Sequence, residues 1–458
     1  MSPAGNERAE ASGARGGIRV FVHSPSEAPD ARSVTTRMPE FECLGERALL
    51  LARPGDVVCV AQAVDPAYLD FLGSLTIGPR AEDVLMVPGV VPGAGLSDRL
   101  LADPSALERL AGRLAGSGPL VLSPFFTTPA AEALARALGT RLGRPARALA
   151  GPPGLVRRLH DKRFARRLAR RLGIPTAPGE SVRVGRGRAV GADLSALRTA
   201  MLRRSRETGR AIVRGSSGAS GSSTYVTDAS GVEATLGAIA ARTDNSIYLV
   251  EPFFEAAVSP NVAFTVDPLS GDVRAAATDQ VLDDALVYRG SLHPSCARRL
   301  PEMLADARAL AGWMRDRGFT GHGGVDFVER AGGPAGPGYF LTEINPRING
   351  ASYPLALLDR LARRAAGRGA PPPRAFRTGG LAVDAHDFDA VARLAGSLLF
   401  DLARGEGVVP FAVAGLAFGK LGLASFAATR ERAKEIFGDV VARAGTMRSP
   451  VHPRTVGA

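Results

Sequence analysis

The sequence predicts a fold of mixed α/β and α+β class, with a parallel-sheet domain first, a larger domain in the middle and a small α+β lobe at the end. Three observations predict it. Apolar runs alternate with helical patterns up to residue 150, glycine and proline punctuate residues 151–154, and a second proline-rich break falls within residues 367–380. The length of 458 residues is enough for two or three domains with cores of their own.

The first domain is expected at residues 17–150, after a small and polar tail at residues 1–16 that has the composition of a disordered segment. Short apolar runs typical of buried strands alternate there with helical patterns. Strands that alternate with helices predict a parallel sheet covered on both faces. The strands are expected at residues 17–22, 56–61 and 119–124, and the helices include residues 105–114 and 129–138.

The composition excludes several classes of protein. The net charge is +12, but the arginines are scattered and no basic stripe contains interleaved aromatic residues, so a nucleic-acid partner is not expected. The surplus of positive charge favours anionic small molecules or acidic peptides. No apolar run reaches the roughly 18 residues that a membrane span requires. The few, widely spaced cysteines (Cys43, Cys59 and Cys296) form neither a disulfide framework nor a zinc spacing, which favours the cytoplasm.

A polar hairpin is expected near residue 340. Residues 324–328 and 339–344 are typical of strands, and the glycine- and proline-rich residues between them predict a turn. Side chains alternate across a strand, so Glu343 and Asn345 share one face, which Asp326 can reach from the partner strand. Two carboxylates and an amide oxygen are ligands that suit Mg²⁺ or Mn²⁺. A solvated hairpin with incidental charges remains the alternative.

Arg347 adds a fixed positive charge beside this predicted metal site, an arrangement that suits a phosphoryl group in transfer. Two further cations lie upstream. Lys162 begins a basic helix at residues 161–172 and is one of few lysines in a chain that otherwise uses arginine. Arg214 ends a strand that runs into a glycine- and serine-rich loop, which could fold over an anion or be a plain surface loop.

An apolar strand follows and breaks at Glu251 and Pro252, before Phe253 and Phe254. Apolar surface beside freed backbone groups suits an adenine ring, and a plain buried strand explains the pattern equally well. Taken in order, the lysine helix, the arginine before a Gly/Ser loop, this strand and the Glu-x-Asn-x-Arg motif resemble the ATP-grasp ligases. The resemblance covers about residues 151–360.

The resemblance implies a role for each matching residue. Lys162 and Arg214 would bind ATP phosphates, Ser220 and Gly221 would belong to the lid loop, and Glu251, Phe253 and Phe254 would form the adenine hinge. Asp326, Glu343 and Asn345 would hold two Mg²⁺ ions, or Mn²⁺ in their place, and Arg347 would stabilise the acyl phosphate. The sequence departs from the family in three places. Arg214 stands where lysine is usual, Asn261 or Glu255 stands near the glutamate that holds ribose, and Gly324 stands where some relatives have arginine.

The flanking segments extend the resemblance. The first domain resembles the pre-ATP-grasp domain, and residues 415–423 with the helix after them resemble the small domain that ends the pheganomycin-type peptide ligases. The expected division is therefore a pre-ATP-grasp domain at 17–150, an ATP-grasp domain at 151–366, a linker at 367–380 and a small C-terminal domain at 381–450.

The function that this resemblance implies is ATP-dependent ligation of a carboxylic acid to an amine in specialised metabolism, releasing ADP and phosphate. The acid would be amino-acid-like, and the amine would belong to an amino acid or peptide whose carboxylates could meet Arg374, Arg377 and Arg404 of the C-terminal lobe. Two alternatives stay open: a degenerate module that binds nucleotide without ligation, and a carboxylating enzyme that uses bicarbonate. Assembly as a homodimer is also left open.

Overall fold

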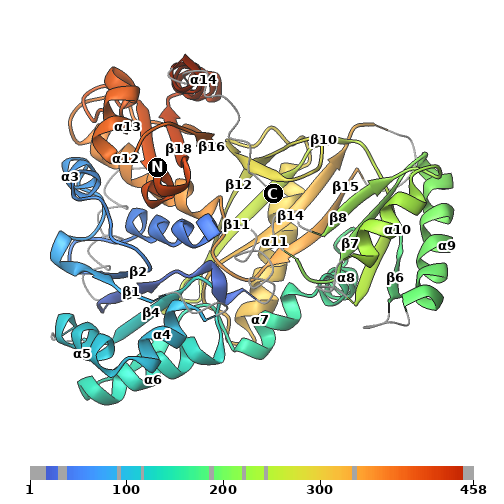
Figure 1. Ribbon diagram of the computed structural model, residues 1–458, viewed down its shortest axis with the longest axis horizontal. Helices are drawn as coiled ribbons and strands as arrows, with labels where there is room; N and C mark the ends of the chain where they lie inside the picture. Colours follow the sequence, from blue (N-terminus) through green and yellow to red (C-terminus); the bar gives the residue numbers. More distant parts are fainter. Residues whose placement is uncertain are drawn as a thin grey trace, which may run out of the picture.

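The computed structural model describes residues 17–28, 39–89, 94–114, 118–184, 190–218, 223–241, 246–332 and 338–446. Within these residues the strands form three sheets, of five, nine and four strands (Figure 1). The predicted tail at residues 1–16 lies outside the described residues. In the described part of the chain, no helix combines the length and the apolar character that crossing a membrane requires.

The N-terminal domain contains the predicted parallel sheet, in the order β3-β2-β1-β4-β5. Val20 and Val22 of its central strand pack on one side among helices of this domain, while Phe21 faces the core of the rest of the molecule. The strands are β1 (Arg19–Val22), β2 (Val57–Val60), β3 (Val84–Met86), β4 (Leu120–Pro124) and β5 (Ala146–Ala148).

Helices cover one face of this sheet, and the other face meets helix α3 (Pro66–Ser74), a 3₁₀ segment, η2 (Pro39–Leu50), and the middle of the chain. Arg360 of α12 (Ser352–Ala366) ties the two parts together by donating to the backbone carbonyls of Leu50 and Ala52, at 3.0 and 2.8 Å. The other helical elements of this domain are η1 (Pro25–Glu27), η3 (Ala81–Asp83), α4 (Leu96–Ala102), α5 (Pro104–Arg113) and α6 (Pro129–Leu142).

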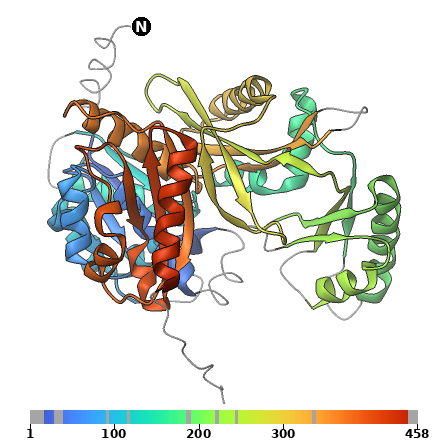
Figure 2. The same cartoon turned by 90° about the horizontal axis from the view of Figure 1, so that it is seen from above.

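The four-stranded sheet lies at one end of the molecule, opposite the C-terminal strands and helices (Figure 2). Its order is β6-β9-β7-β8, and it has a core of its own with its two helices. The segment is entered through α7 (Pro153–His160) and α8 (Lys162–Arg171). Its elements are β6 (Glu180–Arg183), α9 (Val190–Thr208), β7 (Ala211–Gly215), β8 (Thr224–Thr227), α10 (Val232–Ala240) and β9 (Ile247–Pro252).

The nine-stranded antiparallel sheet forms the middle of the molecule and contains the predicted hairpin, formed by β14 (Gly321–Arg330) and β15 (Tyr339–Asn345). Neighbouring strands align Thr278, Asn261, Asp326 and Glu343 in one row across the sheet. Helix α11 (Leu300–Arg315) packs on this sheet, and helices of the C-terminal lobe pack on its last strands. The strands before the hairpin are β10 (Ala256–Val258), β11 (Pro260–Val266), β12 (Val273–Leu282) and β13 (Tyr288–His293).

The C-terminal lobe continues this sheet. Strand β16 (Ala375–Ala382) pairs with β13 on one side and with β18 on the other, so most of the final half of the predicted linker at 367–380 is a strand of the sheet. The apolar residues Ala375 and Phe376 explain this, because both are buried in the main core. The remaining elements are α13 (Phe388–Ala395), η4 (Gly396–Leu398), β17 (Gly407–Phe411), η5 (Val413–Phe418), β18 (Lys420–Ala427) and α14 (Arg430–Thr446).

Candidate functional site

The three predicted metal ligands meet on one face of the hairpin. Asp326 is opposite Glu343 in the register of β14 and β15, and the Asn345 amide donates to Asp326 Oδ2 at 2.9 Å. A second amide, from Asn261 on β11, donates to Asp326 Oδ1 at 2.6 Å. The Asp326 carboxylate is therefore oriented by one amide on each side, and the hairpin geometry expected from the sequence is confirmed.

The two carboxylates of this site have opposite electrostatic surroundings. Burial, together with the neighbouring Glu343 carboxylate, raises the pKa of Asp326. Burial also opposes ionisation of Glu343, but the Lys162 ammonium and other nearby cations outweigh it and lower the pKa of Glu343. Lys162 Nζ lies 3.0 Å from Glu343 Oε1, and the two side chains are 7% and 20% exposed. The surroundings therefore favour the charged form of Glu343 and oppose that of Asp326.

Lys162 is held at the point where three segments meet. The Asp161 side chain caps α8 by accepting the backbone N–H of Arg163 at 2.9 Å, which fixes Lys162 as the first helical residue. Its backbone N–H donates to Ser216 O at 3.0 Å, and its Nζ to Gly218 O at 3.3 Å. Lys162 therefore links the Gly/Ser loop after β7 to the carboxylate on β15.

Arg214 makes the corresponding link from β7. Its guanidinium donates to the Thr342 carbonyl on β15 at 3.0 Å and forms a close ion pair with Glu251 on β9. Glu251 is 3% exposed, and its second oxygen lies 3.4 Å from Nη1 of Arg166. The predicted phosphate ligand Arg214 and the predicted hinge residue Glu251 are therefore direct partners.

Arg166 is a site residue that the sequence analysis missed. It follows Lys162 by one helical turn in α8, and it also donates to the carbonyls of Ala177 and Gly179 at 2.7 and 2.9 Å. The only signal in the sequence was its spacing of four residues from Lys162, which places two basic side chains on one helix face. That spacing was hidden by the other arginines of the same helix.

The predicted hinge aromatics lie at the end of β9. Phe253 stacks under the Arg210 guanidinium at 4.4 Å from the ring centroid, and Phe254 under that of Arg330 at the same distance. Both rings are half-buried. Glu255 pairs with Arg210 at the surface. The contacts of Asn261 favour a role beside Asp326 over the predicted contact with ribose, and the lid-loop residues Ser220 and Gly221 lie outside the described residues.

Arg347 leaves the end of β15 and extends toward the N-terminal domain. Its guanidinium donates to Ile348 O at 3.1 Å and lies 5.3 Å from the ring centroid of Phe125, which follows β4. Beside it, a Cβ added at Gly324 would lie 2.1 Å from Asn349 Nδ2, so the Asn349 amide fills the space that a side chain there would need. The place where some relatives have arginine therefore has no room for one.

The donor set fits a hard divalent cation. Among the described residues no group of three His, Cys, Asp or Glu side chains could hold a metal ion. The predicted set instead has two carboxylates and the Asn345 amide, whose N–H bond to Asp326 leaves its carbonyl oxygen as a donor. Oxygen ligands of this kind suit Mg²⁺ or Mn²⁺.

Comparison with known proteins bears on the fold. A family model described as the pre-ATP-grasp domain matches residues 45–140. Carboxyaminoimidazole ribonucleotide synthase from Aspergillus clavatus, solved with ATP, matches with a TM-score of 0.51 at 13% identity, over 94% of this chain and 99% of that one. Biotin carboxylase from Campylobacter jejuni matches with a TM-score of 0.55 at 11% identity, over 94% of this chain and 95% of that one. A search of curated proteins by sequence found no match.

The fold is that of the ATP-grasp enzymes. In this ATP-grasp fold the four-stranded sheet and the nine-stranded sheet enclose the cluster of Lys162, Arg214 and Glu343 between them. These residues come from α8, β7 and the hairpin, and hydrogen bonds from Lys162 and Arg214 reach β15.

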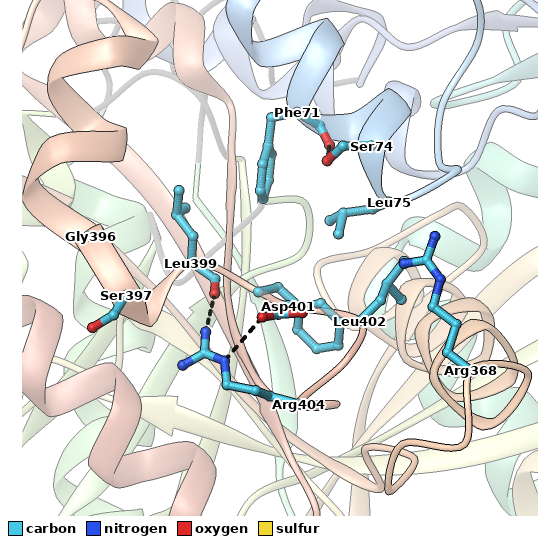
Figure 3. A pocket seen from close by; sticks show the side chains of 11 residues that line it. Phe71, Ser74, Leu75, Arg368, Gly396, Ser397, Leu399, Asp401, Leu402 and Arg404 are labelled. Carbon is cyan, nitrogen blue, oxygen red and sulfur yellow. Dashed lines mark hydrogen bonds and ion pairs between the residues drawn. The ribbon is translucent and has the colours of Figure 1, made fainter.

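The three C-terminal arginines expected to meet a peptide have different surroundings. Arg374 is exposed at the start of β16, and Arg377 stacks on Phe437 of α14 at 4.7 Å. Arg404 lies in a turn, where it donates to Leu399 O at 2.9 Å and pairs with Asp401 at 3.5 Å. That turn lines an open cavity of about 460 Å³ against α3 (Figure 3).

Proposed function

We propose that the protein is an ATP-dependent carboxylate–amine ligase that forms an amide bond through an acyl phosphate and releases ADP and phosphate. The proposal rests on one observation above all. Lys162 and Arg214 are brought from separate segments to the face of the hairpin that carries Asp326, Glu343 and Asn345. A site with paired cations and hard oxygen ligands suits the movement of a phosphoryl group, because charge must be neutralised on both sides of it.

ATP would be a substrate and Mg²⁺ a cofactor of this reaction. Asp326, Glu343 and Asn345 would hold the metal, which would neutralise phosphate charge when bound. Lys162 and Arg214 would bind phosphate oxygens, and Phe253 and Phe254 would flank the adenine. Arg347 would stabilise the acyl phosphate, because it lies just past the metal ligands and carries a permanent positive charge.

The chemistry would proceed in two displacements. An oxygen of the acid attacks the γ-phosphorus of ATP and ADP leaves; the amine then attacks the acyl carbon, loses a proton, and phosphate leaves. The protein's own contribution is alignment and charge stabilisation. Joining an amino-acid-like acid to an amino acid or peptide, as the pheganomycin-type ligases do, is the finer form of the proposal.

A carboxylating reaction with bicarbonate is the second candidate, since a biotin carboxylase and a carboxyaminoimidazole ribonucleotide synthase share the fold. At 11–13% identity the likeness in fold favours neither chemistry. The absence of room for an arginine at Gly324 separates this chain from the relatives that have one.

A screen for ADP release tests the proposal. The full-length protein is supplied with ATP, Mg²⁺ and pairs of carboxylic acids and amines, in parallel with bicarbonate, and products are identified by mass spectrometry. Release that requires both an acid and an amine, with a condensed product, supports ligation. Release that requires bicarbonate supports carboxylation, and nucleotide binding with no release under any condition supports a binding module. Arg347→Ala is the matched control.

A further inference from the structure

The N-terminal sheet has a topological switch point between β1 and β4, because the chain runs outward to β2 and β3 on one side and to β5 on the other. In open parallel sheets, ligands bind in the crevice beyond the carboxyl ends of the strands at such a point. Here those ends are followed by His23 after β1 and Phe125 after β4. Arg347 lies over the Phe125 ring, so these strand ends adjoin the proposed reaction centre.

Buried aromatic side chains from two domains pack together just beyond these strand ends. The His23 ring meets Phe125 at 6.4 Å and Tyr353 at 5.8 Å between centroids, and its Nδ1 lies 2.9 Å from the Tyr353 hydroxyl. Tyr353 belongs to the first turn of α12, shortly after Arg347. On the other side of Tyr353, the Arg47 guanidinium from η2 stacks at 4.6 Å from the ring centroid. Arg47 and Arg347 therefore flank one aromatic group.

Arg47 brings a positive charge to this aromatic group. Arg47 is half-buried; its Nε donates to Leu44 O at 2.9 Å, and no carboxylate of the described residues forms an ion pair with it. Burial and the Arg47 cation hold the pKa of His23 at about 3, so this imidazole is neutral at physiological pH. Burial raises the pKa of Tyr353 to about 12, so its hydroxyl stays protonated. An incoming anion would meet a preformed cation.

We infer that Arg47 binds the non-reacting carboxylate of the amine substrate, which makes that substrate an α-amino acid. The inference rests on the proposed ligase function. An amine that attacks an acyl phosphate held at Arg347 would approach the side of this aromatic group. In an α-amino acid the carboxylate carbon lies about 2.5 Å from the amine nitrogen, so it would arrive there with the amine. A guanidinium binds a carboxylate through two parallel hydrogen bonds, which selects for it over a neutral group.

The test compares two amines in two proteins. Once an acid and an amino acid that support ADP release are known, kcat/KM is measured for the amino acid and for its primary amide, with the wild-type protein and with Arg47→Met. The wild type should prefer the free carboxylate by about 10- to 100-fold, the value of a charge-assisted contact. Arg47→Met should lose most of this preference while the KM for ATP stays unchanged.

Two further variants make the result specific. Arg374→Met removes an exposed arginine of the C-terminal lobe and should keep the preference. Arg47→Lys keeps the charge and much of the stem that packs on Tyr353, and should recover part of the preference without the full bidentate contact. Arg47→Lys disturbs the packing least. If Arg47→Met has a lowered unfolding temperature, the preference of Arg47→Lys for the free carboxylate over the amide is therefore the test of the inference.

The outcomes separate this inference from the function on which it rests. A wild-type protein that uses the amino acid and its amide equally well overturns the role of Arg47 and leaves the ligase proposal intact. An Arg47→Met protein that keeps the full preference also overturns it, and a loss in Arg374→Met would move the carboxylate site to the C-terminal lobe. If no pair of acid and amine supports ADP release, both proposals fail.

Discussion

The ion pair between Lys162 and Glu343 leads to a prediction with an unusual sign. During the reaction Lys162 is expected to bind a phosphate and Glu343 a metal ion. In the free protein the two side chains instead form an ion pair with each other. Glu343→Gln keeps the size of the side chain but removes its charge. We therefore expect this variant to bind ATP more tightly than the wild type in the absence of metal, although it should lose turnover by about 10²–10³-fold with Mg²⁺ present.

The magnitude follows from the geometry of the pair. At 3.0 Å and an effective dielectric constant of about 20, the Coulomb attraction is about 5–6 kcal/mol before desolvation is subtracted. Hydrogen bonds to charged groups retain about 1.5–3 kcal/mol. A glutamine can still accept a hydrogen bond from Lys162, so about half of this, about 0.8–1.5 kcal/mol, should be freed. That corresponds to about a four- to twelvefold lower Kd for metal-free ATP.

The assay is isothermal titration calorimetry of ATP in the presence of a chelator, and of Mn²⁺ in the absence of nucleotide. Lys162→Met should have the reciprocal effect, because it frees Glu343 and so tightens Mn²⁺ binding without nucleotide. Glu329→Gln is the matched control, since Glu329 is buried on the same hairpin and accepts the Arg299 backbone N–H at 3.3 Å, away from Lys162. Its affinities for ATP and Mn²⁺ should equal those of the wild type.

A metal-free ATP affinity of Glu343→Gln equal to or weaker than that of the wild type would refute the exchange of partners. Unchanged turnover of this variant at saturating Mg²⁺ would instead remove Glu343 from the metal site. The two readouts are independent, so the ion pair and the metal ligand can fail separately.

Three further predictions concern single groups. Lys162→Ala and Arg214→Ala should each weaken MgATP by about 1.5–3 kcal/mol, measured as Kd, whereas Arg347→Ala should lower kcat with the Kd of ATP nearly kept. Arg347→Ala behaving chiefly as an affinity variant would contradict its role. Burial raises the pKa of Glu27 to about 8, so its contribution to stability is complete below pH 4.5 and is lost as the pH rises to 8. The free energy of unfolding of Glu27→Gln, measured by chemical unfolding, should therefore rise relative to that of the wild type by roughly 3–5 kcal/mol between pH 5 and pH 9. A difference that stays constant with pH would mean that Glu27 has an ordinary pKa.

The parts of the site that could be predicted from the sequence are those that depend on local patterns. The hairpin could be derived because alternation places Glu343 and Asn345 on one face, and the structure has Asp326 opposite Glu343. The basic helix expected at residues 161–172 is present as α8, Lys162–Arg171. Both features need information from fewer than about twenty neighbouring positions.

What could not be derived depends on pairing between distant segments. The contact between His23 and Tyr353 joins positions 330 residues apart, and no local pattern links them. Arg47 lies in a 3₁₀ segment with no motif, so its place beside Tyr353 became visible only in the fold. The ion pair between Arg214 and Glu251 was missed for a different reason, because the resemblance had assigned the two residues to different parts of the nucleotide.

The C-terminal lobe supplies the last prediction, because its continuity with the central sheet has an energetic consequence. Phe376 on β16 is fully buried, stacks on His293 of β13 at 5.4 Å and meets Phe426 of β18 at 6.0 Å. It therefore bridges the ATP-grasp sheet and the lobe within one core. Phe376→Ala should cost about 3–5 kcal/mol, as for other buried phenylalanines.

If the lobe and the sheet unfold together, Phe376→Ala lowers the same thermal transition that MgATP raises, and a single transition remains. Phe437→Ala is the control, since Phe437 is only half-buried on α14 and packs outside this bridge, against Arg377. It should cost less and leave the response to MgATP unchanged. Two separate transitions, only one of them sensitive to MgATP, would show that the lobe is an independent unit. The lobe as a whole could then be removed to test whether it forms the acceptor site. If the core is shared, removing the lobe would unfold the protein, so the acceptor site can be tested only by single substitutions such as Arg47→Met.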